Sequence, residues 1–140
     1  MDTDNKSSIL YRAVLSFVFT KSKKDWKGYS VQDEDLEDHH LFPKRSITKN
    51  LGVKGSENYI NTVLNKVLIS KSANNETRDD SPDKYLKDFN NLPEFIIPDS
   101  FKINAIPNTF GGYQDCLKKR YDLIKFMLKE RVISCLEHSK

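Results

Sequence analysis

The segment DHHLFP, residues 38–43, is the stretch of the chain in which metal-ligating side chains cluster. His39 and His40 are neighbours, and Pro43 follows His40 in a His-x-x-Pro spacing. An imidazole can ligate a metal ion, and it can accept a proton near neutral pH. Taken alone, the segment also fits a structural histidine pair or a solvated loop, so its meaning depends on the sequence around it.

Two further polar signals follow this segment along the chain. Asn65 comes just before the apolar residues 67–69, which read as a buried strand. Asn74 and Asn75 then lie in a short polar stretch, residues 71–80, that is compatible with a helix. Three such signals in this order are hard to obtain by chance, which favours a functional interpretation of the two histidines.

Helical periodicity marks both ends of the chain. Apolar residues between Ser8 and about Lys21 recur as on an amphipathic helix. Residues 113–135 repeat apolar side chains every three or four positions, which predicts a long helix that reaches nearly to the C-terminus. Aromatic residues on these two helices are expected to pack in the core rather than to stack on bases. They are Phe17, Phe19, Tyr121 and Phe126.

Two shorter helices are predicted between these ends. Pro43 can occupy the first turn of a helix over residues 44–51, which Gly52 ends. The dipeptide Ser81-Pro82 has the form of an N-cap followed by the first helical residue, and this helix is expected to run to about Asn90.

An irregular connection is predicted over residues 92–109. Its prolines and proline-adjacent turns forbid a long regular element. Gly111-Gly112 is expected to close this connection before the last helix begins.

Length and composition fit one soluble globular domain. The chain has 140 residues, of which 37% are hydrophobic and 31% charged, and its formal net charge is +3. The longest apolar stretch, residues 13–19, is too short to cross a bilayer, and no signal peptide opens the chain. We therefore expect no membrane partner and a cytoplasmic location. Cys116 and Cys135 are far apart, which excludes a zinc ribbon and a disulfide framework and leaves His, Asp, Asn or Glu as ligands for any metal.

The three signals together resemble the HNH, or ββα-metal, nucleases. Their pattern is an acid or His before His-x-x-Pro on a first strand, an Asn before an apolar second strand, and a metal ligand on the following helix. Within this class, the chain most resembles the C-terminal nuclease domain of GmrSD-type modification-dependent restriction proteins. The likeness includes residues 81–86 (SPDKYL) and covers roughly residues 8–137. It also includes apolar and basic residues of the last helix, namely Tyr113, Leu117, Arg120 and Ile124.

That resemblance implies a role for each motif residue. His40 would be the general base, and His39 and Asn74 would hold one divalent metal ion. Asn65 would tie down the loop between the strands and so hold the base in place. Many relatives carry Asp where this chain has His39, so Mg²⁺ or Mn²⁺ is expected but Zn²⁺ or Ni²⁺ also suits the imidazole.

Alternative assignments remain open at three of these positions. Asn75 competes with Asn74 as the ligand, because a slip of one residue would exchange them. Asp38 would be the ligand only if His39 were the base, which would break the spacing to Pro43. For Asn65, an ordinary polar residue at the start of a strand is as good an interpretation as a positioning role.

Basic residues near the motif are candidates for phosphate contacts. Residues 44–54 contain several Lys and Arg and no acid, whereas the acids of residues 33–38 would repel DNA and are expected to bind protein or to keep a loop solvated. The alternative for the basic residues is a solvated loop. The predicted DNA-binding residues are Lys44, Arg45, Lys49 and Lys71.

These inferences combine into one prediction. Residues 1–140 should form a single α+β HNH nuclease domain, with a ββα-metal core and a short antiparallel hairpin over about residues 35–90, wrapped by helices over 8–21 and 111–137. By resemblance, the domain would cleave DNA in restriction or anti-phage defence, leaving 5′-phosphate and 3′-hydroxyl ends. It would be guided by a separate targeting or nucleotide-sensing domain or subunit. The alternative function is a catalytically inactive DNA- or protein-binding module on the same scaffold.

Overall fold

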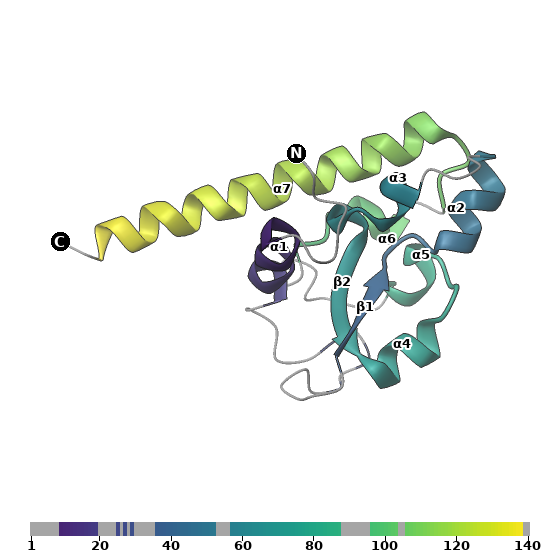
Figure 1. Cartoon of the computed structure of the whole chain (residues 1–140), viewed down its shortest axis with the longest axis horizontal. Coiled ribbons are helices and arrows are strands. Elements are labelled where there is room, and N and C mark those ends of the chain that lie inside the picture. The colour runs from purple at the N-terminus through teal and green to yellow at the C-terminus, as the bar shows by residue number, and fades with distance from the viewer. Residues whose placement is uncertain are drawn as a thin grey trace.

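The computed structural model of the chain describes residues 9–19, 25, 27, 29, 36–52, 57–87, 96–103 and 106–138 (Figure 1). Helices dominate, and the described residues contain one pair of strands. The elements in chain order are α1 Ile9–Phe19, β1 Leu36–His40, α2 Lys44–Leu51, α3 Glu57–Asn61, the 3₁₀ helix η1 Val63–Asn65, β2 Lys66–Ser70, α4 Lys71–Thr77, α5 Pro82–Tyr85, α6 Ser100–Ile103 and α7 Phe110–Glu137.

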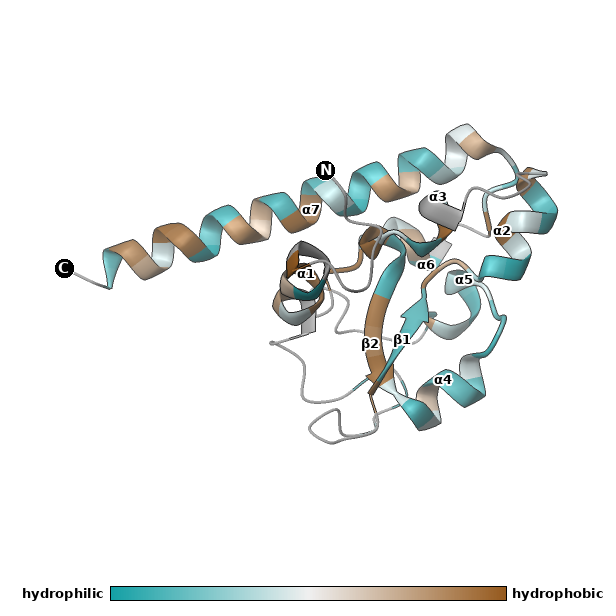
Figure 2. Ribbon diagram, viewed as in Figure 1, coloured by the Kyte–Doolittle hydropathy of each residue, from teal (hydrophilic) through white to brown (hydrophobic). Residues whose placement is uncertain are grey.

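Strands β1 and β2 pair antiparallel, with His39 opposite Val67 and His40 opposite Lys66. The predicted α+β class, with a short antiparallel pair and a long C-terminal helix, is confirmed. Figure 2 shows that β2 is hydrophobic through its middle, whereas β1 is mostly hydrophilic. The core therefore takes its strand residues mainly from β2, and β1 is left to carry polar side chains.

Helix α4 follows β2 with no residue between them. Ser70 is its N-cap: the Ser70 Oγ accepts a hydrogen bond from the Ala73 N–H at 3.1 Å and donates one to Asp25 Oδ2 at 2.5 Å. A serine N-cap satisfies one of the free N–H groups of the first helical turn. This direct junction fixes the position of α4 relative to the strands.

The main core lies where β2, the 41–42 turn, α6 and the first half of α7 meet. The Phe42 ring packs against Phe101 at 4.9 Å between centroids and edge-on against Tyr113 at 5.9 Å. Leu41, Phe42, Val67, Ile69 and Phe101 are fully buried. The turn that follows β1 is thus anchored in the core by Leu41 and Phe42. This packing restrains His39 and His40, which come just before the turn.

The predicted helix over residues 44–51 is confirmed as α2, and Gly52 ends it with a φ of 61°. A positive φ is accessible to glycine without steric cost. The predicted buried strand is confirmed as the centre of β2, and the polar stretch after it forms α4. The Lys71–Thr77 bounds place Asn74 one turn into that helix.

Two predicted boundaries are wrong. The helix that begins at Pro82 ends at Tyr85 rather than near Asn90. Gly111 and Gly112 do not close a loop but lie in the first turn of α7, because the Thr109 side chain caps this helix by accepting a hydrogen bond from the Gly112 N–H.

The connection predicted to hold no long regular element contains, among its described residues, only the four-residue helix α6. The first helix begins and ends inside its predicted range, at Ile9 and Phe19. The prediction that aromatic side chains of the last helix pack in the core is wrong for Tyr121 and Phe126, which are 43% and 55% exposed. The Phe19 side chain lies outside the described residues.

Helix α7 has two different halves. The part up to Ile124 is anchored by five buried residues, and the C-terminal end of the helix projects away from the rest of the fold (Figure 1). The anchors are Tyr113, Cys116, Leu117, Arg120 and Ile124. Apolar residues continue at helical spacing beyond Ile124, which is why the sequence pattern could not show where the packing ends. None of the described helices is both long and apolar enough to span a membrane.

Candidate functional site

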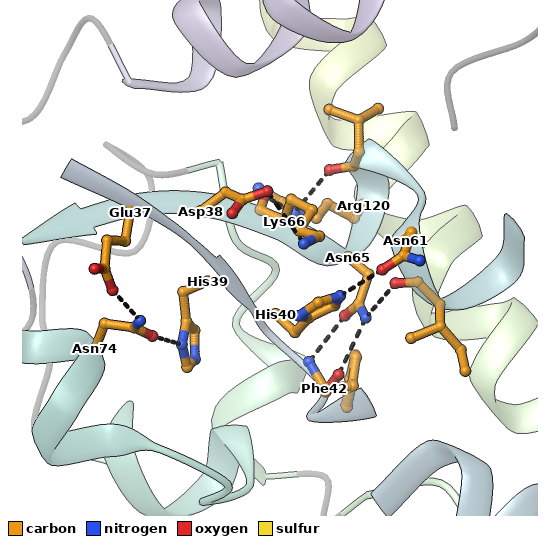
Figure 3. Close-up of polar contacts among 12 residues, drawn as sticks. Glu37, Asp38, His39, His40, Phe42, Asn61, Asn65, Lys66, Asn74 and Arg120 are labelled. Atoms are coloured by element: carbon orange, nitrogen blue, oxygen red, sulfur yellow. Dashed lines mark hydrogen bonds and ion pairs between the residues drawn. The ribbon is translucent and has the colours of Figure 1, made fainter. Parts of the chain in front are cut away.

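His39 on β1 and Asn74 on α4 face each other (Figure 3). The His39 Nδ1 and the Asn74 Oδ1 are 2.7 Å apart. The Asn74 Nδ2 donates a hydrogen bond to Glu37 Oε2 at 2.5 Å. Because a carboxylate can only accept, Glu37 fixes the amide of Asn74 with its oxygen toward His39. Glu37 and His39 alternate along β1 and therefore point to the same face.

His39 is held in a closed environment, with 3% of its surface exposed. The Tyr85 ring packs edge-on against the imidazole at 5.5 Å between centroids, and the Tyr85 hydroxyl donates to the Leu41 carbonyl at 2.6 Å. Burial is the main cause that lowers the pKa of His39, which keeps the ring neutral at pH 7. A neutral imidazole is the form that ligates metals.

His40 has a separate partner. Its Nε2 lies 3.0 Å from the Asn61 Oδ1 (Figure 3). Since an amide oxygen can only accept, the proton of the neutral ring resides on Nε2, and Nδ1 is the basic nitrogen. Burial first, and then the charge of Lys66, lower the pKa of His40 to about 4. The ring is therefore unprotonated at neutral pH.

Asn65 binds the turn after β1 with its side chain. The Asn65 Oδ1 accepts from the Phe42 N–H at 2.8 Å, and the Nδ2 donates to the carbonyls of Phe42 and Ile60 at 3.1 and 3.0 Å. The Asn65 carbonyl also accepts from the Leu41 N–H at 2.9 Å. The side chain is fully buried and bonds only to backbone, so it positions the turn that follows His40 and lies outside the lining of the cleft.

Arg120 reaches from α7 to the backbone on either side of Asn65. Its Nη1 donates to the carbonyls of Leu64 and Lys66 at 2.8 and 2.6 Å, and its Nε donates to the Ile96 carbonyl at 3.2 Å. Burial lowers the pKa of Arg120 to about 9, so the guanidinium still carries its charge at pH 7. A fully buried cation thus fixes the segment that carries Asn65.

Both histidines and Asn74 line one polar cleft of about 190 Å³. The structure therefore gathers the predicted base and the two predicted metal ligands at one place. Asn75 is exposed and does not line the cleft. The remaining lining residues are Asp38, Pro43, Lys44, Arg78 and Asp79.

The acids of β1 have specific partners, so their interpretation as part of a solvated or protein-binding run is wrong. Glu37 binds Asn74, and Asp38 Oδ2 lies 3.2 Å from the Nζ of Lys66, whose side chain is 2% exposed. The ion pair gives Asp38 a structural role. The other residues of that run, 33–35, lie outside the described residues.

Three of the four predicted DNA-binding residues gather beside the cleft. Lys44 lines it, and a neighbouring hollow of about 570 Å³ is lined by Lys44, Arg45 and Lys49 together with Thr48 and Asp79. All three cations are exposed. Lys71 is also exposed, as the first residue of α4, but it lines neither hollow.

A divalent ion suits the pair formed by His39 and Asn74. Two ligands on adjacent positions of one ion, each roughly 2.1 Å from it, lie about 3 Å apart. The 2.7 Å between His39 Nδ1 and Asn74 Oδ1 is close to this spacing. As the contact stands, it is a hydrogen bond that Nδ1–H donates to the amide oxygen, so Nδ1 would ligate an ion only after the ring proton has moved to Nε2. Among the residues that the structure describes, no group of three His, Cys, Asp or Glu could complete a site formed by protein alone. Phosphate and water would have to supply the other ligands.

Sequence reasoning missed four residues that shape the site: Glu37, Asn61, Tyr85 and Arg120. Tyr85 and Arg120 lie in the stretches that carry the family resemblance, but the resemblance assigns them no role. For Glu37, the period-two alternation with His39 was a usable signal, because residues two apart on a strand share a face. Nothing local in the sequence marks Asn61 as the partner of His40.

No protein-family model matches the chain, and no solved structure matches it. An uncharacterized protein of Methanocaldococcus jannaschii is 35% identical over 85 residues, which are 60% of this chain and 14% of that protein. The chain therefore corresponds to a small part of this relative.

Proposed function

We propose that the chain is a metal-dependent DNA endonuclease with the HNH, or ββα-metal, architecture. One observation carries the proposal: an antiparallel strand pair leads directly into a helix, and His39, His40 and Asn74 line the same cleft at this junction. The order of the elements and the types of the side chains agree with the pattern that the sequence resembles. The strand pair and α4 would be the ββα core.

His40 would act as the general base. Its Nδ1 would accept a proton from a water molecule whose oxygen attacks the phosphorus of a phosphodiester. The bond from phosphorus to the 3′ oxygen would break, and this oxygen would take a proton from solvent, which leaves a 5′-phosphate and a 3′-hydroxyl. The hydrogen bond to Asn61 supports this role, because it fixes the ring and leaves Nδ1 as the basic nitrogen.

His39 and Asn74 would hold the metal ion, with Mg²⁺ or Mn²⁺ as first choices and Zn²⁺ or Ni²⁺ as alternatives. When bound, the ion would offset negative charge on the phosphate and on the leaving 3′ oxygen. Glu37 would keep the amide oxygen of Asn74 directed to the ion, a role that supporting carboxylates often have at metal sites.

DNA would be held by the exposed cations beside the cleft. Lys44, Arg45 and Lys49 offer a small electrostatic surface and no evident element that reads bases, so weak binding with little sequence preference is expected. Selection of a target would then fall to another domain or subunit. Restriction or anti-phage defence in the cytoplasm is the biological setting that this proposal favours.

The test is cleavage of supercoiled plasmid by the chain with Mg²⁺, Mn²⁺, Zn²⁺ or Ni²⁺, followed as conversion to nicked and linear forms. We expect cleavage that EDTA abolishes. Asn74→Ala should raise the metal concentration needed for half-maximal rate, and the matched variant Asn75→Ala should behave as wild type, because Asn75 is exposed and outside the cleft. If Asn75→Ala is the damaging change, the ligand is assigned one residue too early.

Binding without cleavage would contradict the proposal. If the chain binds duplex DNA but cleaves none with any of the four ions, the inactive binding module on the same scaffold is the better description. Titration of each ion against the chain, followed by calorimetry, then shows whether the pair of His39 and Asn74 still binds metal.

A further inference from the structure

Arg78 occupies a backbone conformation that normally belongs to glycine. Its φ and ψ are 43° and −117°, and the Asp80 N–H donates to the Thr77 carbonyl at 2.9 Å. These values are those of the first central residue of a type II′ turn, a position that glycine dominates because a Cβ is strained there. A side chain that persists at such a position raises the question of what it does.

The side chain of Arg78 is directed by its own turn. The Nε donates to the Asn75 carbonyl at 3.0 Å, and Arg78 lines the cleft together with His39, His40 and Asn74. Within the part of the chain that the structure describes, no carboxylate forms an ion pair with this guanidinium. Its charge is therefore available at the end of α4.

Lys44 stands at the same cleft from a different element, as the first residue of α2. Two acids also line the cleft, Asp38 and Asp79, and Asp38 is paired with the buried Lys66. Two cations from separate elements at one cleft suit an anion. A guanidinium matches the two free oxygens of a phosphodiester in particular.

We propose that Arg78 is a phosphate-binding residue of the cleft, which holds a phosphodiester of the DNA strand together with Lys44. This inference rests on the proposed function for the identity of the anion, and it adds a residue that the sequence motif did not single out. The unfavourable turn geometry is retained because the side chain that it carries contacts the substrate.

The test separates binding from cleavage by working in the His40→Ala background, with the full chain and a fluorescein-labelled DNA duplex. Fluorescence anisotropy gives the affinity, and its salt dependence gives the number of phosphate contacts. Arg78→Gly should weaken binding roughly three- to tenfold and reduce the salt slope by about 1. The same variant should raise the melting temperature, because glycine fits the turn.

Two further variants make the result specific. Arg78→Gln removes the charge without relieving the turn, so it should lose the same affinity without the gain in melting temperature. Lys129→Gln removes one exposed charge from the far half of α7 and should leave binding unchanged. Arg78→Gly or Arg78→Gln with wild-type affinity and slope would overturn the inference.

This outcome is distinguishable from failure of the proposed function. If Arg78 variants lose DNA affinity but the wild-type chain never cleaves plasmid, the phosphate contact stands and the nuclease assignment falls. If the wild-type chain cleaves and Arg78→Gly binds and cleaves equally well, the nuclease assignment stands and this inference falls.

Discussion

The side chains beneath the cleft and those that line it bond to different kinds of partner. Asn65, Tyr85 and Arg120, which we call the frame, donate to or accept from backbone groups and are at least partly buried. His39, His40 and Asn74 bond to other side chains and line the cleft.

That difference has an energetic consequence. A frame residue that is removed leaves buried backbone groups without partners, and each such group costs about 1–3 kcal/mol. A cleft residue that is removed leaves its partner next to a space that water can enter. Frame variants should therefore lose stability, and cleft variants should lose activity while they remain folded.

Arg120→Met should have the largest effect on stability. The carbonyls of Leu64, Lys66 and Ile96 would lose their donors in a buried place, so we expect a loss of about 3 kcal/mol or more in urea unfolding. Arg131→Met is the matched control on the same helix. Arg131 lies over the Phe17 ring at 5.5 Å and is exposed, and its loss should cost about 1 kcal/mol or less. Equal effects of the two variants would contradict the frame role of Arg120.

Asn65→Ala should come next, with a loss of about 2 kcal/mol or more, because three hydrogen bonds to backbone disappear. Plasmid cleavage should fall with it, even at a temperature where the variant is fully folded, since the turn after His40 is no longer held. Circular dichroism and cleavage assays on the same sample distinguish the two losses. A variant that is destabilised but cleaves normally would show that Asn65 serves the fold alone.

His40→Ala should reverse this pattern. The loss of the base should reduce cleavage by roughly 10²–10⁴-fold, whereas the melting temperature should remain close to that of wild type. Its side-chain partner is Asn61, and Asn61→Ala should reduce cleavage by less, because the ring remains but is no longer fixed. If His40→Ala cleaves plasmid at the wild-type rate, His40 is not the general base.

The division between frame and cleft also marks what the sequence could predict. The cleft residues belong to short motifs on neighbouring elements, and helix α2 is bounded by Pro43 and Gly52, whose backbone preferences are local. The frame depends on contacts between distant segments: Tyr85 meets Leu41 at a separation of 44 residues, and Arg120 meets Lys66 at 54. A single sequence carries no direct signal for such pairs.

The second half of α7 shows that an apolar sequence pattern does not by itself predict burial. Val132 and Leu136 continue the apolar spacing of the helix, yet they are 58% and 63% exposed. Periodicity reports that a face is apolar, but burial depends on whether another element reaches that face. The expectation of core packing for Phe126 failed for this reason.

The smallest change in stability is expected from charge reversal at the rim of the cleft, because the affected side chains are exposed. With three to five phosphate contacts, the slope of log affinity against log salt for the wild-type chain should be roughly −3 to −4. Lys44→Glu with Arg45→Glu should flatten this slope by about 2 while leaving the melting temperature and the binding of metal at His39 unchanged.

The matched pair Lys125→Glu with Lys129→Glu makes the same change in net charge on the exposed far half of α7 and should leave the slope nearly unchanged. Equal flattening by both pairs would mean that DNA senses only the net charge. A wild-type slope near −8 would mean that the surface for DNA extends well beyond this rim.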